Sequence, residues 1–272
     1  MEIINTILIE PLVNGLAMFY RLMGGNMGLG IIVFTVVLRL LLTPLTKPYM
    51  ESMKKMKDYQ KDIDKLKKKY KNEPLKLRQA QADFFREKGI NPGAGCLPYL
   101  LQIVVLIALF RVFTSILVPG EDVTAKFNER LYQPLQFQDG VKINTHFLYL
   151  DISEPDKFDV AGLPFSLPGP ILILAALVQF LSAKLSMPYL EEEKKLAAKT
   201  KDSKDDMQVA LQSSMIYTFP LMTLLIGLNF PSGLALYWVT FSVFQFIQQY
   251  RSQGWGGLTP LIKRLGLLQL RG

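Results

Sequence analysis

Long apolar segments alternate with lysine-rich segments along the chain. Five apolar segments are each about 20 residues long, enough for a helix rising about 1.5 Å per residue to cross a hydrocarbon core of about 30 Å. This pattern predicts an all-α integral membrane protein with a five-helix transmembrane core. The predicted spans are residues 28–47, 96–118, 168–188, 213–230 and 231–250.

Residues 1–27 are also apolar, but polar side chains such as Glu10, Asn14 and Arg21 interrupt them. This composition favours an amphipathic helix that lies in the membrane interface. A sixth span over residues 3–23 is the alternative. We expect no signal peptide, because no basic segment precedes the apolar stretch and no small-residue cleavage site is apparent.

The sequence pattern of residues 48–95 predicts an antiparallel helical hairpin. Apolar residues recur at near-helical spacing among lysines, beginning with Met50, Met53 and Tyr59. Asn72-Glu73-Pro74 breaks this run, and a second helical stretch that contains Phe84 follows. The segment is either a solvated spacer or a mobile arm that meets a nascent chain, a ribosome, a targeting factor or lipid headgroups. We expect it to be mobile, because few apolar residues tie it down.

Loop charges predict the orientation of the spans. Residues 47–95 hold 14 Lys and Arg against 7 Asp and Glu, whereas residues 118–167 hold 4 against 8. The tail, residues 251–272, holds 4 basic residues and no acidic one. The positive-inside rule therefore places the hairpin and the tail in the cytoplasm, and the loop 119–167 outside it. The loop 189–212 is mixed, with 5 basic and 6 acidic residues, and the alternation of the five spans places it in the cytoplasm.

Arg39 lies in the middle of the first predicted span. A charge at that depth costs at least about 2.5–3.5 kcal/mol on insertion scales, so it marks a candidate functional site. The plainer reading is an arginine that extends to a lipid headgroup, but the end of the span is about 12 Å away. None of the five spans contains Asp or Glu. Water, backbone carbonyls, lipid phosphate or a visiting acidic group would then balance the charge.

Three predicted spans each carry one stripe of polar side chains within about 60–80° of the helix circumference. Because polar groups seldom face lipid, the stripes should face each other or a shared wet cavity. Hydrogen bonding between helices is the alternative for the glutamines and serines, but not for the arginine. The stripes consist of Thr35, Arg39, Thr43 and Thr46; of Gln179, Ser182 and Ser186; and of Trp238, Ser242, Gln245 and Gln249.

The chain lacks the residues that several functional classes of membrane protein require. A proton-coupled or cation-coupled transporter usually needs a carboxylate or histidine relay inside the membrane, and a nucleotide-driven pump needs a phosphate-binding loop. Neither pattern occurs in the chain. One cysteine, Cys96, and one histidine, His146, form neither a disulfide nor a metal cluster. We therefore expect no enzyme, no cofactor and no metal, but a passive, positively charged groove with a cytoplasmic arm.

The chain resembles the YidC/Oxa/Alb family of membrane protein insertases, and within it the bacterial YidC proteins. Motifs that carry the resemblance occur in family order over nearly the whole chain from about residue 10. They are Val36-Val-Leu-Arg-Leu-Leu-Leu-Thr-Pro-Leu-Thr46, Gly89-Ile-Asn-Pro-Gly-Ala-Gly-Cys-Leu-Pro-Tyr-Leu-Leu-Gln102 continuing to Ala108-Leu-Phe-Arg111, Leu148-Tyr-Leu-Asp-Ile-Ser-Glu-Pro-Asp156, and Phe230-Pro-Ser-Gly-Leu-Ala-Leu-Tyr-Trp238 continuing to Gln249.

The resemblance implies a hydrophilic groove that opens to the cytoplasm and to lipid but not to the outside. Such a groove moves short hydrophilic substrate tails across the bilayer while the apolar segment passes into lipid, without ATP hydrolysis of its own. Arg39 matches the family's groove arginine, and Thr35 and Trp238 match positions taken to contact substrate. Gln102 and Gln179 are weaker candidates.

The resemblance further implies a multi-pass protein of the bacterial plasma membrane that functions as a monomer. Its implied partners are nascent membrane proteins, the phospholipid bilayer, the ribosome, the signal recognition particle pathway and the Sec translocon, with no specific nucleic acid. The chain lacks the large periplasmic domain of some members. Its tail is short and modestly basic, which puts strong unaided ribosome docking in doubt, and no lipobox cysteine occurs near its start.

Two other functions fit parts of the pattern. In an anion transporter or channel, Arg39 would bind a small anion, but such proteins commonly contain internal repeats, and the five unequal spans show none. In a scaffold subunit that only packs other membrane proteins, a carboxylate of the partner would hold Arg39.

Overall fold

The computed structural model describes residues 5–70, 73–90, 97–118, 120–138, 140–185 and 203–264. This part of the chain is mostly helical, in agreement with the predicted all-α class. The helices are η1 (Asn5–Ile9), α2 (Glu10–Leu22), α3 (Met27–Asp58), α4 (Gln60–Lys69), α5 (Pro74–Glu87), α6 (Leu97–Ile116), α7 (Val123–Asn128), η3 (Gln133–Leu135), α8 (Pro170–Leu185), α10 (Ser203–Gly227), α11 (Ser232–Gln253), η4 (Gly256–Leu258) and α12 (Thr259–Arg264).

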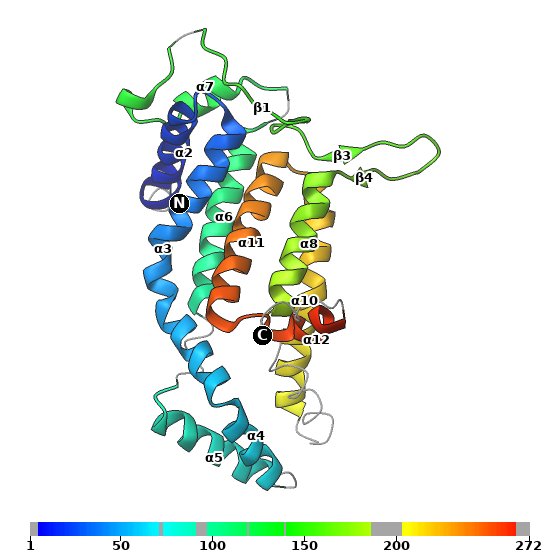
Figure 1. The fold of residues 1–272 in the computed structure, drawn as a ribbon. Helices are drawn as coiled ribbons and strands as arrows, with labels where there is room; N and C mark the ends of the chain where they lie inside the picture. The colour runs from blue at the N-terminus through cyan, green and yellow to red at the C-terminus, as the bar shows by residue number, and fades with distance from the viewer. Residues whose placement is uncertain are drawn as a thin grey trace. The chain divides into compact units, whose positions relative to one another are not determined.

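The chain divides into two units, each with its own internal packing (Figure 1). The first unit contains α2, α7, most of α6 and α8, and parts of α3, α10 and α11; it consists of Met1–Leu41, Ile103–Phe180 and Tyr217–Gln245. The second unit contains α4, α5 and α12; it consists of Leu42–Gln102, Leu181–Ile216 and Phe246–Gly272.

Helix α3 is longer than the span predicted from its apolar residues. The helix continues past Lys47 to Asp58, with Pro44 and Pro48 inside it. Within the described chain, only Met27–Pro48 is both long and apolar enough to cross a membrane by length and composition. Three shorter apolar helices accompany it: Ile103–Ile116, Pro170–Leu185 and Ile216–Gly227.

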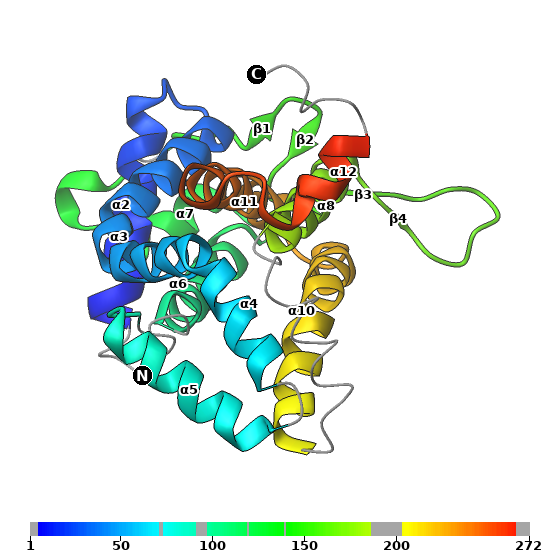
Figure 2. The ribbon, with the colours of Figure 1, turned by 60° about the horizontal axis from the view of Figure 1, so that its bottom comes forward.

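Close helix packing in the first unit depends on two glycines, Gly227 at the end of α10 and Gly233 at the start of α11. Figures 1 and 2 both show α11 between α3 and α8. At Gly233, an added Cβ would lie 2.8 Å from a Leu117 methyl carbon of the segment that follows α6. At Gly227, it would lie 2.2 Å from a methyl carbon of Leu172 on α8. Glycine at these two positions therefore allows the chain segments to approach closely.

The segment between α6 and α8 is folded, although the sequence analysis treats it only as a loop. Asp122 begins α7 as its N-cap, accepting a hydrogen bond from the Thr124 amide at 2.8 Å. Two antiparallel hairpins follow, β1 (His146–Phe147) with β2 (Leu150–Asp151), and β3 (Lys157–Phe158) with β4 (Leu167–Pro168). We call residues 120–169 the cap.

The cap binds the first backbone amides of three helices, which have no partner within their own helix. The Ser232 and Gly233 amides of α11 donate to the carbonyls of Glu154 and Ile152, at 2.8 and 3.0 Å. The Met27 amide of α3 donates to the Asn144 carbonyl at 3.2 Å. On α8, the Ile171 amide donates to the Tyr149 hydroxyl at 3.0 Å and the Leu172 amide donates to a carboxylate oxygen of Asp156 at 2.8 Å. These bonds fix the cap to the ends of the helices.

The N-terminal helix α2 packs against the same cap. The buried Asn14 side chain donates to the Arg130 carbonyl at 3.1 Å and accepts from the Tyr132 amide at 2.8 Å. Arg21 donates to two cap carbonyls, and its guanidinium lies 4.8 Å from the ring centroid of Phe137. Two of the polar residues that interrupt the apolar stretch therefore bind the cap.

In the second unit, α4 and α5 lie side by side (Figure 2). Tyr59 and Phe84 join them through an edge-to-face ring contact with centroids 5.8 Å apart. The Lys55 ammonium in the last turn of α3 donates to the carbonyl of Gly89, which follows α5, at 3.1 Å. Among the side chains of residues 50–90 that the structure describes, the buried large apolar ones are Ile63 and Ile90.

Candidate functional site

Arg39 projects from the middle of the apolar part of α3 and packs on aromatic rings of α11. Its guanidinium carbon lies 3.7 Å from the ring centroid of Phe241 and 5.9 Å from that of Phe244. Such cation–π contacts contribute about 0.5–2 kcal/mol, most where water is excluded. The half-buried Arg39 therefore places its guanidinium against a surface that favours cations.

These rings belong to an aromatic face of α11 that the sequence analysis missed. Tyr237, Phe241 and Phe244 follow one another at helical spacing, and the rings of the first two lie 5.9 Å apart. This face is about a quarter turn from the polar stripe predicted on the same helix. The i, i+4, i+7 repeat of aromatic residues could have revealed it.

Thr35 and Trp238 lie within one helical turn of the contact between Arg39 and Phe241. Thr35 is fully buried, and its hydroxyl donates to the Ile31 carbonyl of its own helix at 2.6 Å. Trp238 and Ser242 are buried on α11. Half-buried Gln245 follows one turn later. Trp238, Ser242 and Gln245 thus lie on the helix whose rings contact Arg39, and their grouping with Arg39 in one groove stays a prediction.

The other predicted groove residues have different surroundings. The Gln179 side-chain oxygen accepts a hydrogen bond from the Thr223 hydroxyl at 2.7 Å, which joins α8 to α10. Thr43 belongs to the second unit, and its carbonyl accepts from the Thr46 hydroxyl at 2.9 Å. The side chain of Gln102 lies outside the described part of the structure, as does Cys96.

The predicted hairpin residues are distributed over the end of α3 and over α5. The Met50 carbonyl accepts a hydrogen bond from the Ser252 hydroxyl at 3.4 Å. The Lys88 ammonium lies 5.7 and 5.8 Å from the ring centroids of Tyr59 and Phe84, above their contact. The side chain of Met53 is outside the described residues.

The cap contains a buried carboxylate, Asp156. Its two oxygens accept from the Tyr149 hydroxyl at 3.0 Å and from the Leu172 amide at 2.8 Å. A carboxylate at the beginning of α8 also interacts favourably with the helix dipole. Burial raises the pKa of Tyr149 to about 12, with a further contribution from Asp156.

Asp151 fixes the turn that follows β2. Partial burial would raise the pKa of Asp151, but hydrogen bonds from the Ser153 hydroxyl and amide and from Thr145 lower it below its ordinary value. No group of three His, Cys, Asp or Glu side chains that could hold a metal ion occurs among residues 5–70, 73–90, 97–118, 120–138, 140–185 and 203–264.

The chain is similar to known bacterial membrane proteins over most of its length. The model of a family described as 60Kd inner membrane protein matches residues 18–254. A membrane protein insertase YidC of Fusobacterium nucleatum is 33% identical over 83% of this chain and 85% of its own length. A membrane protein insertase YidC 2 of Listeria innocua is 30% identical over 89% of this chain and 69% of its own length.

Other relatives are longer. A membrane protein insertase YidC of Chlorobium luteolum is 33% identical over 83% of this chain, which spans only 32% of that protein.

Proposed function

Since the chain belongs to the 60Kd inner membrane protein family, we propose that it is a membrane protein insertase and chaperone. It moves short hydrophilic tails of substrate proteins across the bilayer and releases their apolar segments into lipid, without ATP hydrolysis of its own. The observation that carries the proposal is the position of Arg39 on α3, the one helix of the described chain that is long and apolar enough to cross a membrane, with its guanidinium against Phe241.

The proposed setting is the bacterial plasma membrane, crossed five times. The spans are the apolar parts of α3, α6, α8, α10 and α11, with α2 in the interface. Loop charge supports an orientation in which the pair α4–α5 and the C-terminal tail face the cytoplasm and the cap faces outward.

The packing of Arg39 suits the binding of a visiting carboxylate. A guanidinium stacked on a ring through its flat face still presents N–H donors along its edge. Those donors match the two oxygens of a carboxylate in a bidentate arrangement. The ring of Phe241, with its centroid 3.7 Å from the guanidinium carbon, helps to fix the position of Arg39.

The charge of Arg39 lowers the barrier for an acidic tail. Two opposite unit charges 4 Å apart gain about 4 kcal/mol at an effective dielectric constant of about 20. This gain is comparable to the cost of about 2.5–3.5 kcal/mol for a charged side chain at the centre of a span. The contact between the tail and Arg39 is temporary, so the tail is released after it has crossed the bilayer.

The remaining residues have supporting roles. Thr35, Trp238, Ser242 and Gln245 contact the passing chain beside Arg39. The pair α4–α5 acts as a cytoplasmic arm that meets the nascent chain or the factors that deliver it, among them the ribosome, the signal recognition particle pathway and the Sec translocon. A single copy of the chain is sufficient.

Site-specific crosslinking tests this function. A photoreactive side chain at Thr35 or at Trp238 should crosslink to a ribosome-bound nascent membrane protein, whereas one at Ile107, which is exposed on α6, should crosslink mainly to lipid. Equal crosslinking to substrate from all three positions, or none from the first two, would contradict the proposed groove. Anion conductance by the purified protein in liposomes would instead favour a channel.

A further inference from the structure

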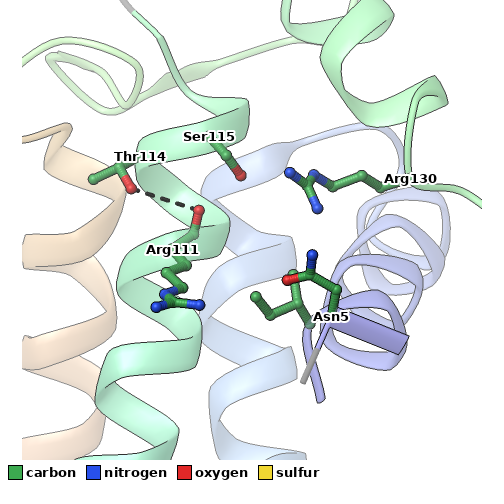
Figure 3. A pocket seen from close by; sticks show the side chains of 6 residues that line it. Asn5, Arg111, Thr114, Ser115 and Arg130 are labelled. Carbon is green, nitrogen blue, oxygen red and sulfur yellow. Dashed lines mark hydrogen bonds between the residues drawn. The ribbon is translucent and has the colours of Figure 1, made fainter. Parts of the chain in front are cut away.

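A polar pocket of about 270 Å³ lies at the end of α6, in the first unit. Figure 3 shows Arg130 reaching from the cap toward α6, with Asn5 and Ser115 directed toward its guanidinium. Three parts of the chain build the pocket: the N-terminal helical segment, the last turns of α6 and the cap. The lining residues are Asn5, Ile9, Arg111, Thr114, Ser115 and Arg130.

The pocket is positively charged. Arg111 and Arg130 both line it, and the structure gives neither guanidinium an ion pair with a residue of its described part. The Thr114 and Ser115 hydroxyls donate to carbonyls one turn earlier on α6, at 2.8 and 3.2 Å, so their oxygens remain oriented by the helix. Two guanidiniums and the Asn5 amide offer several hydrogen-bond donors to an anion.

The pocket continues the outward-facing surface of α6. Ile103, Val104 and Ile107 are exposed apolar side chains on one face of this helix, and Arg111 follows on that same face one turn later. Arg111 is about 21 Å along the helix from Leu97, which places it toward one end of a span. Where an apolar surface gives way to arginine and hydroxyl groups, a membrane helix reaches the headgroup layer.

We propose that this pocket binds the phosphate group of an anionic phospholipid in the leaflet that faces away from the cytoplasm. The inference rests on the membrane-spanning arrangement proposed above, but not on the insertase activity. Guanidinium groups bind phosphate oxygens through paired hydrogen bonds. The bound headgroup joins the N-terminal segment, through Asn5, to α6 and to the cap.

Native mass spectrometry of the purified full-length protein, with its lipids exchanged for detergent, tests the site. Phosphatidylglycerol should bind to the wild type, and Arg111→Gln and Arg130→Gln should each weaken that binding by at least about tenfold. Arg86→Gln, a matched change at an exposed arginine of α5, should leave it unchanged. Equal binding by all four proteins would overturn the proposal.

Two further measurements identify the source of the phosphate and check that the variants fold. Millimolar inorganic phosphate should not displace the lipid; if it does, the pocket is a free-anion site and the lipid assignment is wrong. Arg111→Lys should retain more binding than Arg111→Gln, and thermal unfolding of the Arg111 variants should match the wild type. Because these measurements involve no substrate protein, their failure would leave the crosslinking test of the insertase untouched.

Discussion

At the scale of single residues, the surroundings of Arg39 depend on packing between helices, which is visible only in the folded chain. The sequence predicts a charge inside a span and a threonine one turn before it, because both follow from helical periodicity within one segment. The ring of Phe241 against the guanidinium could not be predicted in this way. The rotation of α11 relative to α3 follows from side-chain packing between the two helices. The pattern of apolar and polar residues within one helix carries no information about that packing.

Gly28 offers a test of the contact between α3 and the cap. A Cβ added there would lie 2.2 Å from the ring of Phe147 in β1, so Gly28→Ala should destabilise the protein by about 1–3 kcal/mol through overcrowding. Thermal unfolding in detergent measures this loss. In a Phe147→Gly background the same change should cost much less, since the ring and the Phe147 Cβ, which lies 2.5 Å from the added carbon, are both gone; an equal cost in both backgrounds would contradict the predicted clash.

Asp151 makes the cap sensitive to acid. Its pKa is lower in the folded protein than its ordinary value of 3.8, so its contribution to stability is present above that pH and is lost as the pH falls below it. The turn that it fixes holds the first amides of α11 through Ile152 and Glu154. Protonation should weaken these bonds.

Hydrogen exchange of the Ser232 and Gly233 amides, corrected for the intrinsic rate, checks this effect. Because the pKa of folded Asp151 lies below 3.8 and the group is partly exposed, we expect modestly faster exchange as the pH falls from 7 to below 3. Asp151→Asn should show the faster exchange already at pH 7 and little further change in acid. A variant that keeps the full acid response would show that another group causes it.

At the scale of elements, the cap is the part that the sequence analysis did not foresee. Its strands are two residues long, too short for an alternating apolar pattern to appear. Its stability comes instead from hydrogen bonds between distant positions, such as those of Asn14 with residues 130 and 132. The one local signal is Asp122, an N-cap residue directly before α7.

The pair α4–α5 should be the least protected helical element. Phe84→Ala removes its ring contact with Tyr59, worth about 0.5–1.5 kcal/mol, and should speed hydrogen exchange over α4 and α5 by about two- to tenfold. Leu75→Ala, at a highly exposed position of α5, serves as the control and should change little. Uniformly high protection of residues 60–87 in the wild type would contradict the expected mobility of this arm.

At the scale of the whole molecule, the helical character of the chain follows from local pattern. Helices such as α6 and α11 correspond to apolar segments that the sequence displays directly. The length of α3 could not be predicted from local pattern. Lys47 and Pro48 are typical of a helix end, but the helix continues to Asp58. Polar residues on α11, such as Ser242 and Gln245, lower its hydropathy, so composition alone is a weak guide to whether α11 crosses a membrane.

The central claim is that the charge of Arg39 assists the passage of acidic tails. Purified wild-type, Arg39→Ala and Arg39→Lys proteins in liposomes, supplied with a nascent substrate that carries an acidic translocated tail, allow a direct test by protease protection of the tail. We predict that Arg39→Ala lowers insertion by at least about tenfold, that Arg39→Lys retains more activity, and that a substrate with a neutral tail is affected little. Insertion of the acidic tail by Arg39→Ala at the wild-type rate would contradict the claim.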